Sequence, residues 1–206
     1  MNKFINKTQW LALGLGIWLL AGCAQTTPKL QQPRPPAYAK LAAYAKLERW
    51  VLIDTRSKTL AVMEGNRPIE IFPKIALGSR GAGVKFVRGD NKTPIGTFRV
   101  GWINDNSRFN RFFGLTYPNL DYAERGYRTG LIDGPTYWAI RSALAVGETP
   151  PQDTPLGGSI GIHGVGYGDP LIHAKFDWTS GCVALNNYQI ERLSRWVNVG
   201  TRVVIR

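Results

Sequence analysis

The sequence predicts a mostly-β domain with a few short helices, and three observations indicate this fold class. Short apolar runs alternate with turn residues through most of the chain after Trp50. Within this region only residues 186–197 show a clear helical periodicity. The 206 residues are enough for one ordinary domain and an export signal, and too few for two well-packed domains. We therefore expect a single folded domain over residues 49–206.

The first strands of this domain are expected to form a meander. Apolar runs occupy residues 51–53, 59–63 and 69–72, and each has the length of a short strand. The intervening segments 56–58 and 64–67 contain Ser, Lys, Gly and Asn, which favour turns. Short strands joined in this way pair antiparallel with their neighbours in the chain.

The remaining strands are expected further along the chain, on either side of a long irregular region. Residues 96–102, 159–163 and 202–205 are apolar runs that suit strands. Residues 101–135 mix Asn, Gly, Pro and aromatic residues, which indicates long loops that build a cleft. The helix predicted over 186–197 begins at an asparagine cap, either Asn186 or Asn187. Its apolar face comprises Ile190, Leu193 and Val197.

The first residues have the features of a bacterial signal peptide. Two lysines precede a short apolar run over residues 10–20, which is shorter than the roughly 20 residues that a membrane-spanning helix needs. The following Leu-Ala-Gly-Cys, residues 20–23, resembles a bacterial lipoprotein cleavage box. This resemblance implies that residues 1–22 are removed and that Cys23 carries lipid. The alternative is an ordinary signal peptide with an incidental cysteine.

A tether is expected between the anchor and the domain. Residues 24–36 are polar and rich in proline, which indicates an extended linker. Residues 37–48 contain two copies of Ala-Tyr-Ala-Lys-Leu, whose residues favour a short helix. Residues 23–48 are thus expected to form a lipidated tether and helix. Ala24 is not Asp, and by the sorting pattern of enteric bacteria this favours a periplasmic protein anchored in the outer membrane.

The chain is strongly basic, with 26 Lys and Arg against 14 Asp and Glu and a formal net charge of +12. Such a charge attracts polyanions. The sequence contains no zinc-finger, basic-helix or RNA-binding sheet motif, so nucleic acid is not an expected partner. The basic residues are scattered, which favours a solvated basic surface over binding to an anionic envelope polymer.

Cys182 is the candidate nucleophile. If Cys23 carries lipid, Cys182 has no partner for a disulfide in an oxidising compartment. A thiol attacks as its thiolate, so a nearby imidazole assists it, and the chain has only His163 and His173. Glycines surround both Cys182 and His163, and Gly181 permits the sharp turn that aims backbone amides at an oxyanion. The residues alone leave two alternatives open: His173 as the base, or a buried and inert cysteine.

Residues 159–185 resemble the signature of the L,D-transpeptidase catalytic domain, also called the YkuD domain. The signature contains a histidine, a short gap, then Ser or Thr, a variable residue, Gly, Cys and an apolar residue, and this chain matches it at His163, Thr179, Gly181, Cys182 and Val183. The resemblance implies a β-sandwich with a few short helices.

A second stretch extends the resemblance toward the start of the domain. Residues 89–98, Gly-Asp-Asn-Lys-Thr-Pro-Ile-Gly-Thr-Phe, and the preceding Leu77-Gly78 are similar to the family's upstream motif. The chain departs from the common pattern at Ser180 and Ala184. In its Asp-Trp-Thr-Ser-Gly-Cys form it looks most like the YafK branch, which includes an amidase that removes the murein lipoprotein from peptidoglycan.

The resemblance implies a mechanism without metal or organic cofactor. His163 takes the proton of Cys182, and the backbone carbonyl of Gly164 orients the imidazole. The sulfur attacks the carbonyl of the diamino acid in a peptidoglycan stem peptide. The backbone amides of Ser180, Gly181 and Cys182 form the oxyanion hole. An amine then resolves the thioester in a transpeptidase, whereas water resolves it in an amidase.

The remaining polar and aromatic residues receive lesser roles. We expect Trp178 and Thr179 to contact substrate, although a core position for Trp178 is equally compatible with the sequence. We expect Asp90 and Thr93 to hold turns, and Tyr137 and Trp138 to lie in the core. Arg88 and Lys92 could contact carboxylates of a stem peptide, but the sequence favours a solvated face for each.

The sequence leaves three functional hypotheses. The first is a cysteine transpeptidase that acts on stem peptides, and the second is an amidase with murein lipoprotein as a partner. The third is a non-catalytic, lipid-anchored module that binds peptidoglycan. A papain-like protease fits poorly, because its cysteine would precede its histidine, whereas here His163 comes before Cys182.

Overall fold

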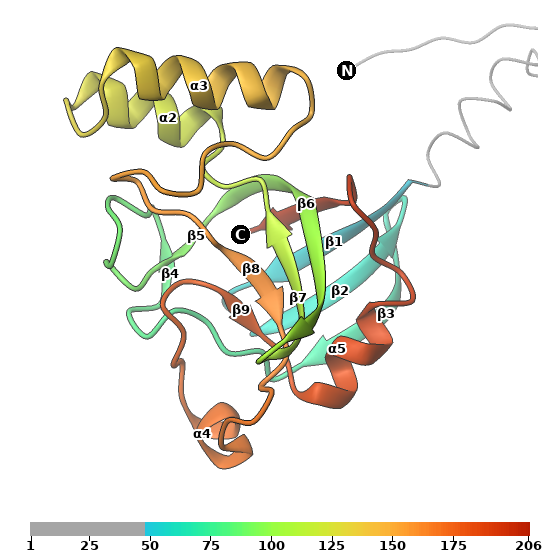
Figure 1. Ribbon diagram of the computed structural model, residues 1–206. Coiled ribbons are helices and arrows are strands. Elements are labelled where there is room, and N and C mark those ends of the chain that lie inside the picture. The colour runs from blue at the N-terminus through green and yellow to red at the C-terminus, as the bar shows by residue number, and fades with distance from the viewer. Residues whose placement is uncertain (1–47) are drawn as a thin grey trace, which may run out of the picture. The chain divides into compact units, whose positions relative to one another are not determined.

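A computed structural model describes residues 48–206, which contain one eight-stranded sheet, one two-stranded sheet and four helices (Figure 1). The large sheet has the order β3-β2-β1-β10-β6-β7-β8-β9. Its strands are β1 (Arg49–Asp54), β2 (Thr59–Glu64), β3 (Arg67–Pro73), β6 (Gly96–Ser107), β7 (Asn110–Leu115), β8 (Gly161–His163), β9 (Val183–Ala184) and β10 (Arg202–Ile205). The prediction of a mostly-β domain is confirmed.

One half of the large sheet is the predicted meander. β1 pairs antiparallel with β2, and β2 pairs antiparallel with β3. On the other side β1 pairs in parallel with β10, which brings the end of the chain beside its first strand. Burial alternates along β1, with Val51 and Ile53 buried and Trp50 and Leu52 half-buried, so successive side chains point to opposite faces of the sheet.

The long strand β6 joins the two halves. Its first residues pair with β10, and its later residues pair with β7, with irregular register near Val100 and again before Ser107. Such irregularities bend a strand and increase its twist. β7 then pairs with β8, and β8 pairs in parallel with β9. The second half therefore ends at the strand that directly follows Cys182.

The two edges of the large sheet approach each other. After β3 the chain continues to Ala76 and Gly78, which form bridges with Ala184 and Thr179. The Ala184 amide donates to the Ala76 carbonyl at 2.8 Å, and the Ala76 amide donates to the Ala184 carbonyl at 2.9 Å. The edge next to the cysteine is thus covered by chain from the opposite half. Beyond it lies the small parallel sheet of β4 (Ala82–Gly83) and β5 (Thr93–Pro94).

The main core lies between the two halves and is shared by both. Its fully buried side chains come from the strands of each half and from helix α5 (Asn187–Leu193). The Asn186 side chain caps α5 and forms a capping box with Gln189, so the predicted asparagine cap is confirmed at the first of its two candidates. α5 ends earlier than the predicted 197, although Val197 still packs into the core.

The prediction of long loops over residues 101–135 is wrong. The segment contains the end of β6, the whole of β7 and helix α2 (Leu120–Arg128), which pairs with helix α3 (Gly134–Ala145). Figure 1 shows these two helices side by side at one end of the domain. They surround a second, smaller core cluster of Ala123, Ile132, Ile140 and Leu156. Asn119 and Asp133 are the N-caps of these helices.

The core prediction for the Tyr137-Trp138 pair is half right. Tyr137 packs against the second cluster, whereas Trp138 is 58% exposed on the outer side of α3. Helix α4 (Pro170–Lys175) was not expected, since its six residues are too few for a periodic pattern to be read.

The signal peptide over 1–22, the lipidated Cys23, and the tether and helix over 24–47 lie outside the described residues. Within residues 48–206, none of the helices combines the length and the apolar character that crossing a membrane requires.

Candidate active site

The site is built around Cys182, which lies in a tight turn directly before β9. The carbonyl of Cys182 accepts hydrogen bonds from the Thr179 hydroxyl at 2.7 Å and from the Thr93 hydroxyl at 3.3 Å. The Thr93 hydroxyl also accepts the Gly78 amide at 2.8 Å. Both threonines are buried, so the backbone beneath the thiol is fixed by groups from three separate segments. Thr93 therefore holds a turn, as the sequence predicted.

Gly181 is the residue that allows the turn. Its φ of +132° lies in a region that side-chain-bearing residues rarely adopt, and a Cβ there would lie 2.8 Å from the Lys92 carbonyl oxygen. The Gly181 amide donates to the Thr179 hydroxyl at 3.1 Å. The cysteine that follows is therefore presented by a backbone conformation that only glycine accommodates without strain.

His163 lies at the end of β8, the strand next to Cys182. The parallel register pairs His163 with Ala184 and Ile162 with Val183, so Cys182 lies beside the start of β8. Positions two apart on a strand share a face, which places the His163 and Cys182 side chains on the same side of the sheet. The sequence pattern of a strand-end histidine followed later by a cysteine turn is thus brought together by a single strand pairing.

The tautomer of His163 is set by its neighbour. The His163 Nδ1 atom lies 2.6 Å from the Gly164 carbonyl oxygen. A carbonyl only accepts, so Nδ1 carries the proton and the neutral ring presents Nε2 as an acceptor. Gly164 is tightly enclosed, since a Cβ there would lie 2.7 Å from the Phe109 carbonyl oxygen. The Gly164 carbonyl is therefore placed to orient the imidazole, which is the backbone role predicted for it.

Aromatic side chains enclose the imidazole. The ring of Phe109 lies 4.3 Å from that of His163, and the ring of Phe112 lies 6.0 Å away in a stacked arrangement. Trp178 completes the enclosure edge-on at 5.7 Å. This burial lowers the pKa of His163 to about 4, because it disfavours the charged ring more than the Gly164 carbonyl favours it.

The thiol is also neutral at rest. Burial raises the pKa of Cys182 to about 11, against a smaller lowering by the Gly161 amide and the Lys85 ammonium. The sulfur lies 3.5 Å from the Ser159 carbonyl oxygen, to which its S–H donates. Within the described residues no hydrogen bond joins the thiol to the imidazole. Proton transfer to His163 therefore requires the S–H to turn away from Ser159.

His173, the alternative base, takes a different place. It lies buried on α4, and its Nδ1 accepts the indole N–H of Trp178 at 3.4 Å. Its Nε2 is buried and has no partner within the described residues. His173 thus supports Trp178 from behind, and this burial corrects the prediction of a loop or cleft-rim residue. Of the two histidines, only His163 lies on the strand next to the cysteine.

The predicted oxyanion donors divide into two kinds. The Gly181 amide is already bonded to Thr179, whereas the Ser180 and Cys182 amides have no protein acceptor in residues 48–206. Thr179 is buried beneath the turn, which differs from the substrate-contacting role predicted for it. Trp178 is half-buried against both histidines.

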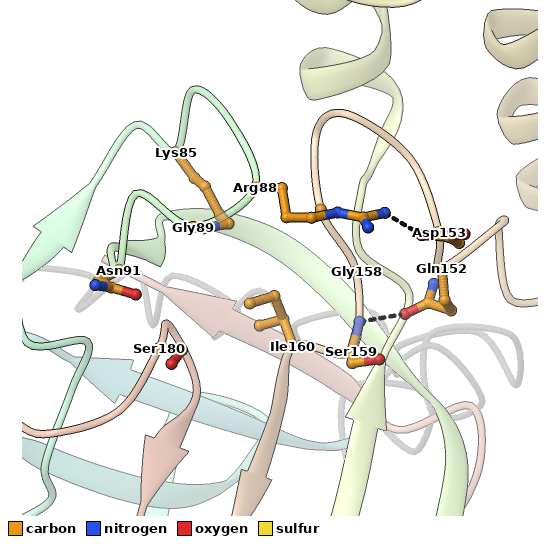
Figure 2. Close-up of a pocket in the computed structure, with 11 residues that line it drawn as sticks. Lys85, Arg88, Gly89, Asn91, Gln152, Asp153, Gly158, Ser159, Ile160 and Ser180 are labelled. Carbon is orange, nitrogen blue, oxygen red and sulfur yellow. Dashed lines mark hydrogen bonds and ion pairs between the residues drawn. The ribbon is translucent and has the colours of Figure 1, made fainter.

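A cavity of about 720 Å³ opens beside the turn. Ser159, whose carbonyl lies near the sulfur, and Ser180, two residues before Cys182, form one wall of it. Lys85 and Arg88 lie on the opposite wall (Figure 2). The Lys85 ammonium pairs with Asp90. Asp90 also accepts the Phe86 amide at 2.8 Å and the Lys92 amide at 3.1 Å, so it holds this loop as predicted.

Sequence reasoning missed the contribution of Lys85. It is a lysine with almost no exposed side chain, which a sequence alone does not reveal. The signal available was the Asp90 side chain five residues later, in a stretch whose glycine and proline indicate a compact loop. Among the described residues, no group of three His, Cys, Asp or Glu side chains is placed to hold a metal ion.

The fold and the site define a class of protein: a β-rich domain that holds a cysteine in a glycine turn beside a histidine on the adjacent strand. The chain belongs to the YkuD family, the L,D-transpeptidase catalytic domain, whose family model matches residues 48–205. The comparisons do not assign it to a branch, so the resemblance to the YafK branch stays a prediction.

Solved structures of several bacterial proteins are similar to the chain. The helical cell shape determining protein Pgp2 from Campylobacter jejuni is 28% identical with a TM-score of 0.52, covering 77% of this chain and 47% of that one. Bd1075 from Bdellovibrio bacteriovorus is 21% identical with a TM-score of 0.49, covering 79% and 49%. The chain spans about half the length of these solved proteins. No curated protein matches it in sequence.

Proposed function

We propose that the protein is a peptidoglycan-modifying cysteine acyltransferase in which Cys182 is the nucleophile and His163 the general base. The observation that supports this most directly is the tautomer of His163. Its Nδ1 proton is held by the Gly164 carbonyl, which leaves Nε2 as an acceptor on the face that Cys182 shares. A histidine with a merely structural role has no need of this arrangement beside a free thiol.

The reaction begins with transfer of the Cys182 proton to Nε2 of His163. The sulfur then attacks the carbonyl carbon of the diamino acid in a stem peptide, and the free Ser180 and Cys182 amides stabilise the oxyanion. The C–N bond breaks, His163 returns the proton to the leaving amine, and a thioester remains on Cys182. Attack by an amine or by water releases the acyl group and restores the thiol.

Two lines of support come from outside the site. Membership of the L,D-transpeptidase family favours acyl transfer on peptidoglycan. The protein Pgp2, with 28% identity, is described as a determinant of helical cell shape. The identity of the acceptor is a separate matter, because transpeptidation and amidase activity share the same thioester.

We also propose that the protein acts in the periplasm, where lipid on Cys23 anchors it in the outer membrane. Its proposed partners are the stem peptides of peptidoglycan and murein lipoprotein. The support is the Leu-Ala-Gly-Cys sequence that follows a short apolar run. Radioactive or mass labelling of Cys23 with fatty acid tests the anchor, and a Cys23→Ser chain that keeps the same lipid mass would contradict it.

The test of activity incubates the full chain, in mild detergent, with tripeptide and tetrapeptide muropeptides. A second sample contains muropeptides that still carry a lipoprotein-derived Lys-Arg remnant. A dimer linked through two diamino acids, or exchange of the terminal D-amino acid, indicates transpeptidation, and loss of the remnant alone indicates an amidase. No product in either sample, with Cys182 shown to be reduced, would reject catalysis and favour a binding module.

A further inference from the structure

The cavity beside the cysteine turn contains one guanidinium that is held in place before any ligand arrives. Arg88 donates from Nε to the Thr154 carbonyl oxygen at 3.2 Å and from Nη2 to the same oxygen at 2.9 Å. Its backbone amide donates to the Pro155 carbonyl at 2.8 Å. The side chain is therefore fixed at both ends, which lowers the entropy that ligand binding has to overcome.

The partner of this guanidinium is weakly held. Asp153 forms an ion pair with Arg88, but its side chain is 92% exposed at the rim of the cavity (Figure 2). Exposed ion pairs contribute little, because water solvates both charges and the side chain loses freedom. Asp153 contacts only Nη2 of Arg88, so an incoming carboxylate can replace it at small cost while Nε and Nη2 stay bonded to the Thr154 carbonyl.

The second cation of the cavity is different in kind. The Lys85 side chain is only 3% exposed and pairs with Asp90, a carboxylate that is itself fixed by backbone amides. Its positive charge is neutralised by Asp90, so Lys85 forms part of the cavity wall and does not offer a free charge to a ligand. Arg88 is thus the group on this wall that is both charged and exchangeable.

The cavity has the position and size for part of a peptide. Its volume of about 720 Å³ falls within the range of about 300 to 1,000 Å³ typical of small-molecule sites. Ser159 and Ser180 lie on its wall, and the sulfur of Cys182 lies 3.5 Å from the Ser159 carbonyl oxygen. Ile160 adds an apolar surface between them. A peptide that acylates Cys182 would place a neighbouring group in this cavity.

We propose that Arg88 is a specificity-determining residue that binds a free carboxylate of the acylating peptide, and that Asp153 occupies its place until substrate arrives. The inference rests on the proposed function, because it assigns a substrate group to that same site. The carboxylate belongs either to the diamino acid or to the residue that follows it. Both carry the chemistry that a fixed guanidinium recognises.

The experiment measures acylation of Cys182 by intact mass in the full chain, with peptides whose two carboxylates are amidated one at a time. Arg88→Ala is expected to lower kcat/KM at least tenfold for the peptide with the recognised carboxylate, mainly through KM, and to leave its amidated form unchanged. Arg88→Lys keeps the charge but loses the planar guanidinium that is held by the Thr154 carbonyl, and it should recover part of the loss. Asp153→Asn removes the competing carboxylate and should lower KM a few-fold. The carboxylate that binds Arg88 is the one whose amidation makes the wild type and Arg88→Ala acylate at the same rate.

Arg195→Ala is the matched control, because it removes the same charge from an exposed position outside the cavity, and it should leave all values unchanged. Equal losses for free and amidated peptides in Arg88→Ala, or no loss for either, would overturn the assignment. If no peptide acylates the wild-type chain, the proposed function fails instead. Binding of the same peptides to Cys182→Ala then tests the carboxylate site alone, and equal affinity for free and amidated forms would reject it.

Discussion

At the scale of single residues, the site is electrically neutral before it reacts. Burial raises the pKa of Cys182 to about 11 and lowers that of His163 to about 4, so both groups are uncharged near pH 7. A thiolate and imidazolium pair is therefore not stored in the resting protein. Charge develops only when the proton moves, at the moment when the free amides of the turn meet an oxyanion.

The first prediction concerns the pH dependence of the thiol. Because the pKa of Cys182 is raised, the thiolate fraction should grow about tenfold per pH unit from pH 7 toward pH 10. Alkylation of Cys182 by iodoacetamide, followed by intact mass, should rise in the same way. A rate that stays level from pH 5 to pH 9 would instead show a preformed ion pair and contradict the neutral resting state.

The second prediction concerns acid stability. His163 has a lowered pKa in the folded state, so the folded protein resists protonation that the unfolded chain accepts. The associated stability is complete above pH 6.5 and is lost as the pH falls toward 4. The difference from the ordinary value of 6.5 corresponds to a loss on the order of 3 kcal/mol.

Urea unfolding of the wild-type chain and of His163→Gln, between pH 7.5 and pH 4, measures this loss. The wild type should lose more stability than the variant over this range. Burial also lowers the pKa of His173, which both proteins retain, so the comparison isolates His163. Parallel curves for the two proteins would show that His163 does not titrate as its burial implies.

Residue types in order along the chain predicted much of this site. The histidine among glycines and the Thr-x-Gly-Cys sequence, together with the family resemblance, predicted that His163 and Cys182 lie close together. The direction of the Thr179 hydroxyl was not predictable, because it depends on which way the turn folds. For the same reason the sequence could not show that the Gly181 amide is bonded to Thr179 while the Ser180 and Cys182 amides are free within the described residues.

At the scale of elements, the cysteine turn depends on strands that are distant in sequence. Thr93 from β5 donates to the Cys182 carbonyl, and the Gly78 amide from the segment after β3 donates to the Thr93 hydroxyl. Single strands were predictable because short apolar runs lie between turn residues, as at residues 51–53. The bridging of Ala76 to Ala184 was not, since pairing between segments so far apart leaves no local pattern.

The third prediction tests how the turn is held. Thr179→Val removes a hydroxyl that donates to the Cys182 carbonyl and accepts the Gly181 amide, and it leaves both groups buried without that partner. The expected cost is about 1 to 3 kcal/mol of stability. Acylation should fall roughly tenfold or more, because the sulfur is no longer fixed.

Thr179→Ser is the matched control, since it keeps the hydroxyl, and it should retain most of the acylation rate. Chemical unfolding and the rate of acyl-enzyme formation, measured on the same samples, separate stability from positioning. A valine variant that acylates as fast as the wild type would remove Thr179 from the machinery of the turn.

At the scale of the whole molecule, the domain has two core clusters that are joined by contacts of two tyrosines. Tyr122 of α2 packs into the main core and stacks near Phe98 of β6. Tyr117 also belongs to the main core, and its hydroxyl donates to the carbonyl of Leu156, which lies in the smaller cluster. The helical pair and the sheet are therefore expected to unfold together.

The last prediction tests this coupling with Ile140→Ala. Ile140 is fully buried in the smaller cluster, and removing its side chain should cost about 2 to 5 kcal/mol. If the clusters are coupled, far-ultraviolet circular dichroism and tryptophan fluorescence should still give one coincident transition, shifted to lower urea. Val146→Ala, at a residue that is 72% exposed beside the same helix, should leave the transition within about 0.5 kcal/mol of the wild type. Two separate transitions in the Ile140 variant would show that α2 and α3 form a unit of their own, and that the Tyr117 and Tyr122 contacts do not join it to the sheet that holds Cys182.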